Sequence, residues 1–177
     1  MPRLFLTIGA ALLAVSVVVT PAAASSAGAR PGNQTIADIV LANDGEFDVL
    51  QAAAAKAGLV GALDGRRQLT VFAPTDMAFV STFEDLLGGT LTEQDVIGFI
   101  NSGGVDAAFG DGALANILLY HVTPGRRTSA SVLDAPRYRM LNGDHLTRGK
   151  LLASGVVATD VPASNGVIHV IGSVLLP

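Results

Sequence analysis

The side chains best suited to chemistry in this 177-residue chain are three histidines, and their surroundings argue against catalysis. His121, His145 and His169 are spaced 24 residues apart, but their flanking sequences do not match, so the spacing does not mark a repeat. His121 and His169 lie in apolar strand-like segments without the short spacing of metal ligands, which favours neutral, hydrogen-bonded core histidines. The glutamates lie away from them, at Glu46, Glu84 and Glu93.

The sequence also lacks the motifs of common catalytic and cofactor sites. It has no Gly-x-Ser-x-Gly nucleophile elbow, no His-Glu-x-x-His zinc motif and no glycine-rich phosphate loop. Because it has no cysteine, a thiol nucleophile, a disulfide and a cysteine-bound metal are excluded. We therefore predict that the protein is not an enzyme and has no catalytic residue, no metal site and no cofactor.

Two further polar positions are explained by local structure. Asp76 follows Thr75 at the start of a predicted helix, where the helix dipole and unpaired N–H groups stabilise a carboxylate. Asn165-Gly166 is typical of a turn in which both residues tolerate positive φ. We interpret both positions as structural.

Composition and charge exclude two classes of protein. Half of the residues are hydrophobic, 15% are charged and mean hydropathy is +0.50, which excludes a disordered acidic chain. The formal net charge is −4 and no run of Lys and Arg exceeds two residues, so nothing resembles a phosphate-neutralising surface. We predict no nucleic-acid partner.

The N-terminus has the layout of a secretory signal peptide, predicted over residues 1–24. Arg3 precedes a mostly apolar stretch over residues 4–19, Pro21 breaks it, and three alanines follow. This stretch is shorter than the ~20 residues of a membrane-spanning helix, which favours cleavage over an uncleaved anchor. Residues 25–33 are predicted as a short linker and residues 34–177 as one domain. We expect a secreted protein with no stable membrane span after cleavage, or a periplasmic one in a Gram-negative source.

The first half of the domain has the pattern of short helices. Capping boxes begin two of them, at Thr35 and Thr92. Apolar residues recur at helical spacing over residues 47–57, and Gly58 follows at the position of a C′ glycine. Asp111 is expected to cap a further helix.

Strand patterns dominate the second half. Residues 69–73 form an early β-branched, apolar run that Pro74 ends, and Asn142-Gly143 is a strong hairpin signal. Further strands are expected over residues 156–159, 167–171 and 174–176. Helices followed by strands predict an α+β fold with mostly antiparallel sheets.

Three segments together resemble the fasciclin-like (fasciclin-1 type) adhesion domain. They are TVFAPTDMAF over residues 70–79, LLYHV over residues 118–122, and ASNGVIHVI over residues 163–171, followed by VLLP at residues 174–177. Their order and spacing match one complete domain over about residues 34–177. The chain departs from the family pattern at Gly172, where an acidic residue is common, and matches only loosely over residues 135–149. The resemblance implies a wedge-shaped β-sandwich with an N-terminal helical bundle.

The resemblance also implies a secreted, non-enzymatic module that binds a cell-surface, matrix or wall protein or glycan. In this family the tyrosine–histidine segment is implicated in adhesion, which here means Tyr120 and His121. Asp160-Val161 occupies the place of an Asp-Ile pair that is interpreted as an integrin-recognition motif in some animal relatives. An exposed carboxylate can ligate a divalent cation held by a receptor.

Alternatives to these assignments remain. Tyr120 and His121 can support the fold that displays a surface elsewhere, and Asp160 can be an ordinary turn residue. A second function, carriage of a small apolar, lipid-like ligand in a groove of the domain, is also compatible with the many Leu, Val and Ala residues, although such residues are needed to fill any core.

Overall fold

A computed structural model describes residues 33–42 and 45–177, in which a four-stranded sheet separates two apolar clusters. The predicted signal peptide, and the linker before Asn33, lie outside the described residues. The helices are α1 (Ile36–Val40), α2 (Asp48–Lys56), α3 (Val60–Leu63), α4 (Asp76–Leu87), α5 (Glu93–Asn101), α6 (Gly104–Phe109), α7 (Ala113–Tyr120), α8 (Ser129–Asp134) and α9 (Arg148–Ala153). The predicted α+β class is confirmed.

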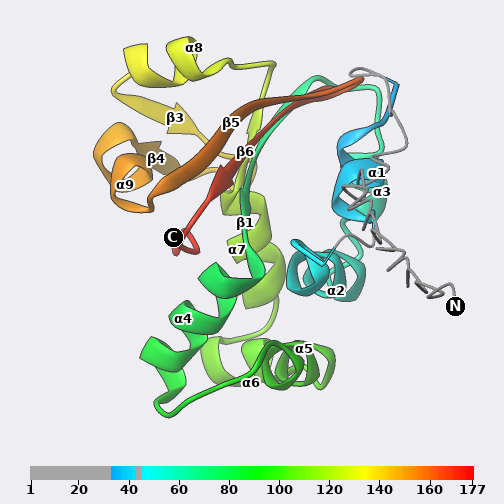
Figure 1. The fold of residues 1–177 in the computed structure, drawn as a ribbon, viewed down its shortest axis with the longest axis vertical. Helices are drawn as coiled ribbons and strands as arrows, with labels where there is room; N and C mark the ends of the chain where they lie inside the picture. Colours follow the sequence, from blue (N-terminus) through cyan, green and yellow to red (C-terminus); the bar gives the residue numbers. More distant parts are fainter. Residues whose placement is uncertain (1–32, 43–44) are drawn as a thin grey trace, which may run out of the picture.

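The strands form one mixed sheet and one separate hairpin. They are β1 (Leu69–Pro74), β2 (Val122–Pro124), β3 (Arg137–Arg139), β4 (His145–Thr147), β5 (Val156–Ala163) and β6 (Gly166–Ile171). The sheet has the order β2-β1-β6-β5, and β3 pairs with β4. In Figure 1, α1 to α3 lie on one side of the sheet, the β3–β4 hairpin with α8 and α9 on the other, and α4 to α6 below it.

The strand pairs are mostly antiparallel, as predicted, and the exception lies at the centre of the sheet. β1 and β6 run parallel from Leu69 opposite Gly166 to Pro74 opposite Ile171, whereas the other three strand pairs are antiparallel. Almost a hundred residues connect β1 to β6, so no tight turn imposes a direction on this pair. Every residue of both strands is buried, as is typical of parallel strands covered on both faces.

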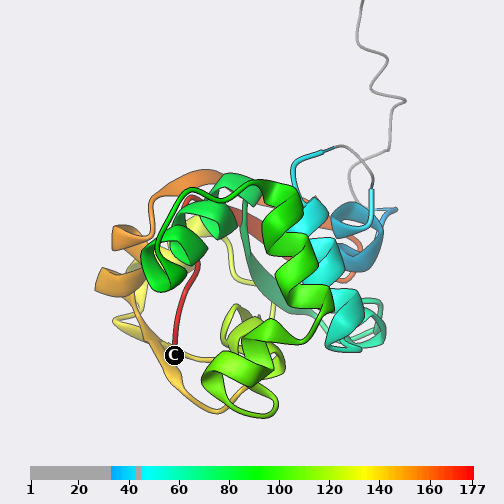
Figure 2. The same ribbon diagram turned by 90° about the horizontal axis from the view of Figure 1, so that it is seen from below.

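Side chains along β1 point alternately into the larger and the smaller apolar cluster. Val71 and Ala73 belong to the larger cluster under the helices, whereas Phe72 belongs to the smaller cluster under the hairpin. Phe72 stacks on His169, its partner across the β1–β6 pair, with ring centroids 5.7 Å apart. Seen from below, the green helices α4 to α6 cover the end of the sheet, close to the chain's last residues (Figure 2).

Local signals in the sequence are mostly confirmed. Thr35 and Thr92 form the predicted capping boxes, and Gly58, with φ 68°, follows Ala57, the C-cap residue of α2. The Asn142-Gly143 signal marks the β3–β4 hairpin, in which Gly143 has φ 99°.

Three local predictions are wrong. Residues 174–176 are not a strand, since they pair with none of the described strands, and His121 ends helix α7 instead of lying in a strand. Asp111 does not cap α7: Gly112 is its N-cap residue, and the Asp106 carboxylate accepts the N–H of Leu114 at 3.0 Å.

The buried side chain of Asn165 joins three parts of the chain at the turn between β5 and β6. Its Oδ1 accepts the N–H of Ile36 at 2.8 Å, and its Nδ2 donates to the carbonyls of Leu63 and Gly65 at 2.7 and 2.9 Å. Each partner can only donate or only accept, so the amide has a single compatible orientation. The turn thereby fixes α1 and the loop after α3.

Gly166 is required for a reason other than the one expected from the sequence. Asp160 is the only non-glycine residue with positive φ in the described chain, and Gly166 is not among the glycines with positive φ. A Cβ on Gly166 would lie 2.0 Å from the carbonyl oxygen of Leu69. The close approach of β1, not backbone conformation, excludes a side chain here.

Candidate interaction surface

His121 lies in the interior at the end of α7. Its Nδ1 is 2.7 Å from the carbonyl of Ile117, and the N–H of Leu175 donates to its Nε2 at 2.9 Å. Because Nε2 accepts, the ring proton is on Nδ1 and is donated to Ile117. Burial lowers the pKa of His121 to about 4, so the ring is neutral at neutral pH. Both ring nitrogens therefore hold the fold together, as expected for a core histidine.

Tyr120 is equally buried and packs in the smaller cluster. Its hydroxyl donates to the carbonyl of His145 at 3.3 Å, and the Lys150 Nζ lies 5.0 Å from its ring centroid. Lys150 also donates to the carbonyl of Leu176. Tyr120 and His121 thus fasten the hairpin and the last residues of the chain to α7.

Asp160 is exposed on β5, where its carboxylate is held by the start of α8. It accepts the N–H of Ser129 at 2.8 Å and also the Ser129 hydroxyl, and these bonds hold its pKa below the ordinary value. Its backbone N–H donates to Nδ1 of the buried His169 at 3.3 Å. With φ 60°, Asp160 lies where the pairing of β5 with β6 is irregular.

The four predicted partner-binding residues do not form one site. Tyr120 and His121 are buried beneath the hairpin and the chain's last residues, whereas Val161 is half-buried against the helical cluster and only Asp160 is exposed. A partner can therefore contact Asp160 fully and Val161 in part, whereas Tyr120 and His121 can act only through the shape of the fold.

Residues that the sequence prediction missed lie just before Asp160. Leu152, Val156 and Val157 are 53%, 40% and 63% exposed, at the end of α9 and the start of β5. β5 is an edge strand, and residues 156–160 are all exposed. The signal available in the sequence was the pair of consecutive valines after Gly155. A strand with one face in the core buries every second residue, so one of two adjacent valines is expected to be exposed. We call Leu152, Val156, Val157 and Asp160 the β5 surface.

Three carboxylates meet at another place, beneath α2. Oxygens of Asp48, Asp76 and Glu93 lie within 4.8 Å of one another, close enough for ligands of one cation. Both Asp76 oxygens, however, accept backbone N–H groups at the start of α2, from Asp48 at 3.1 Å and Val49 at 2.9 Å. Burial, followed by the charges of Asp76 and Asp48, raises the pKa of Glu93. The Asp76 carboxylate thus caps α2, a helix other than its own, and this role explains its position.

We expect Asp76→Asn to lower the free energy of unfolding by about 1–2 kcal/mol at pH 7. The amide retains one acceptor oxygen but presents an NH₂ group to the second N–H, and it loses the charge that favours a helix N-terminus. Urea unfolding measures the change. Asp85→Asn is the matched control, since it makes the same charge change on the exposed side of α4 and should cost under about 0.5 kcal/mol. Equal effects of both variants would contradict the capping role.

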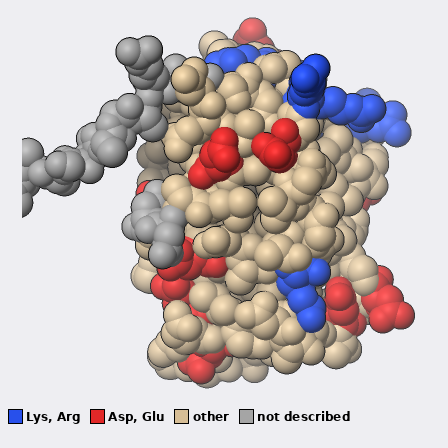
Figure 3. Space-filling model, turned by 90° about the vertical axis from the view of Figure 1, so that its right-hand side faces the viewer, with Lys and Arg blue, Asp and Glu red and all other residues tan. Residues whose placement is uncertain are grey.

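Charges elsewhere do not gather into a single strong patch on the face drawn in Figure 3. Acidic and basic side chains of both signs are scattered there over a largely uncharged surface. Within the described residues, no helix is long and apolar enough to cross a membrane.

Comparison with known proteins defines the class. Residues 45–177 match the Fasciclin domain family model, so the chain belongs to the fasciclin-domain family. It is 37% identical over 172 residues to Protein sll1483 of Synechocystis, covering 92% of this chain and 81% of that protein. It is also 32% identical over 157 residues to the transforming growth factor-beta-induced protein ig-h3 of Sus scrofa, covering 83% of this chain but 20% of that protein.

A solved structure has the same fold. It is a FAS1 domain pair from the insect cell adhesion molecule Fasciclin I, which aligns with a TM-score of 0.53 at 19% identity. The match covers 81% of this chain and 51% of the insect chain. The resemblance inferred from the three sequence segments is therefore confirmed for family and fold. Domains of this family are generally non-catalytic adhesion and interaction modules.

Proposed function

We propose that this chain is a secreted, non-enzymatic adhesion domain that binds a cell-surface, matrix or wall protein or glycan through its β5 surface. The observation that carries the proposal is the exposure of Leu152, Val156 and Val157 on an edge strand of a fasciclin domain. Large apolar side chains exposed within a few residues of one another are a feature of protein interaction sites. On the same strand Asp160 supplies an ionised carboxylate, whose pKa is lowered by its hydrogen bonds from Ser129.

In this proposal Tyr120 and His121 contribute to adhesion indirectly. Their hydrogen bonds to His145 and Leu175 hold the hairpin and the chain's last residues in place. Substitutions there reduce binding only as far as they reduce the folded population or alter the fold. The mechanism is surface complementarity without chemical turnover.

The test is attachment of cells or matrix polymers to the immobilised chain. Val157→Asp should reduce attachment at least tenfold without lowering the melting temperature, because it places a charge within the β5 surface. Met77→Asp is the matched control, since Met77 is also strongly exposed, at 74%, but lies on α4 instead of β5. Full attachment by Val157→Asp, or equal loss in both variants, would refute the assignment.

A second arm of the experiment asks whether a cation bridges the contact. Asp160→Asn removes the charge, retains an acceptor for Ser129 and tolerates φ 60°. If Asp160 ligates a receptor-held cation, a divalent-cation chelator and this substitution reduce attachment to the same level, and together they have no further effect. Attachment that is insensitive to both leaves the apolar residues as the contact.

A further inference from the structure

We propose that a pocket between α4, α6, α7 and the chain's last residues binds a small, neutral aromatic compound of one or two rings. The pocket has a volume of about 240 Å³. Its principal apolar lining residues are Phe79, Phe83, Phe109, Leu114, Ile117 and Leu176. The pocket shares no lining residue with the β5 surface, and its proposed binding does not depend on adhesion.

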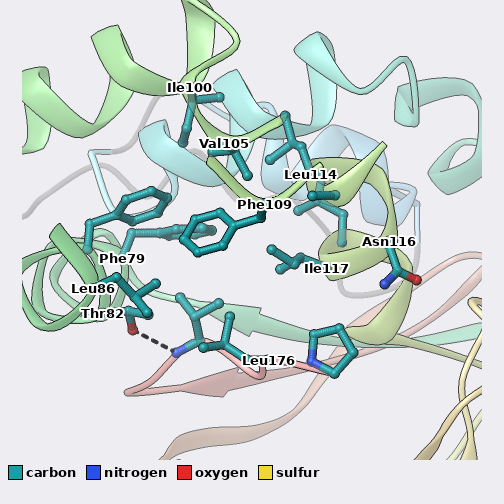
Figure 4. A pocket seen from close by; sticks show the side chains of 15 residues that line it. Phe79, Thr82, Leu86, Ile100, Val105, Phe109, Leu114, Asn116, Ile117 and Leu176 are labelled. Carbon is teal, nitrogen blue, oxygen red and sulfur yellow. Dashed lines mark hydrogen bonds between the residues drawn. The ribbon is translucent and has the colours of Figure 1, made fainter. Parts of the chain in front are cut away.

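The shape of the pocket arises from elements far apart in the sequence. Figure 4 shows the rings of Phe79 and Phe109 facing a common space, with Ile117 and Leu176 bounding it on other sides. Phe79 comes from α4, Phe109 ends α6, and Ile117 lies on α7. Phe109 is 48% exposed, and Leu86 at the rim is 42% exposed, so a ligand has a path from solvent.

The pocket lining has few polar side chains that could bind water or a charged ligand. None of the described side chains that line the pocket is charged, and the polar ones are Thr82 and Asn116. The Thr82 hydroxyl donates to the carbonyl of Ala78 at 2.7 Å and accepts the N–H of Val174 at 3.4 Å. Asn116 is exposed and accepts a hydrogen bond from Asn142 at 3.1 Å. A water molecule needs two to four polar partners, which the apolar interior does not supply.

The volume of the pocket and its lining residues together indicate the class of ligand. Apolar cavities of about 150 Å³ admit benzene, whereas drug-sized ligands occupy about 300–1,000 Å³. A volume of about 240 Å³ thus fits one or two rings and is small for the lipid-like ligand considered from the sequence. Three phenylalanine rings offer the faces and edges on which an aromatic ligand packs favourably.

The experiment titrates the purified 177-residue chain with 2-naphthol, a neutral two-ring fluorescent probe, by fluorescence and calorimetry. A dissociation constant on the order of 10–100 µM is expected for a ligand of this size. 2-Naphthalenesulfonate, which has the same rings and a negative charge, should bind at least tenfold more weakly because the lining supplies no cation. No saturable binding of 2-naphthol up to about 1 mM, or equal affinity for both probes, overturns the proposal.

Variants locate the site. Phe109→Ala should weaken 2-naphthol binding about tenfold while remaining folded, because the ring is half exposed. Ile117→Trp should abolish binding by filling the pocket. Leu152→Ala, which truncates a similarly exposed apolar side chain on α9, is the control and should bind as the parent chain does. Parental affinity in Phe109→Ala overturns the assignment, even if Ile117→Trp fails to fold.

Discussion

Asn165→Asp should lower the free energy of unfolding by about 4 kcal/mol at pH 7, measured by urea denaturation. The parent amide donates from Nδ2 to the carbonyls of Leu63 and Gly65 and accepts the N–H of Ile36. A carboxylate has the same shape but no donor, so a buried negative charge would face two carbonyl oxygens. The substitution therefore removes two hydrogen bonds and adds repulsion at the junction of α1, the loop after α3 and the β5–β6 turn.

Two comparisons separate this cause from a general sensitivity of the turn. Ser164→Ala changes the adjacent exposed side chain and should alter stability by less than about 0.5 kcal/mol. The difference in unfolding free energy between the parent and Asn165→Asp, measured at the same pH, should become smaller as the pH falls. A protonated carboxyl group regains one hydrogen-bond donor. A deficit below about 1 kcal/mol at pH 7 would show that the amide hydrogen bonds are not important for stability.

Acidification should destabilise the protein through His121. Burial depresses its pKa from the ordinary 6.5 to about 4, so between these values the unfolded chain binds a proton that the folded protein does not. Stability from this group is therefore complete above pH 6.5 and is lost progressively as the pH falls towards 4. The difference corresponds to about 3 kcal/mol. Protonation would also convert Nε2 from an acceptor to a donor facing the N–H of Leu175.

A substitution separates the contribution of His121 to the pH dependence of stability from the contribution of the carboxylates. His121→Gln does not titrate, so unfolding free energies of parent and variant, measured from pH 4 to pH 8, should converge by about 3 kcal/mol on acidification. His145→Gln changes an exposed histidine on the β3–β4 hairpin and should keep the parental pH dependence. A constant difference between parent and His121→Gln across this range would contradict the role of His121.

Much of the secondary structure was predictable because its signals are local. A capping box such as Thr35 with Asp38 places both hydrogen-bonding partners within one helical turn. The Asn142-Gly143 turn likewise needs only adjacent residues. Residues 174–176 have the composition of a strand but pair with no strand in the part of the chain that the structure describes, and composition alone does not reveal that.

The candidate site was predictable only in part. Asp160 was identified as an exposed carboxylate, which it is, but its bonds to Ser129 join positions 31 residues apart in the chain. His121 was predicted to be a core histidine, which it is, but the partners of Tyr120 and His121, at residues 145 and 175, lie too far along the chain to be predicted. Leu152, Val156 and Val157 look like core residues in the sequence, and only the edge position of β5 leaves them exposed.

By itself, the sequence determined the family, the α+β class, the positions of the local caps and turns, and the absence of cysteine chemistry. These properties depend on residue identity and on spacing within a few residues. Tertiary structure alone decided the parallel β1–β6 pair, the capping of α2 by Asp76, the bond between His121 and Leu175, and the pocket beside Phe109. Each of these joins segments distant in sequence, whose mutual placement depends on how the whole core packs.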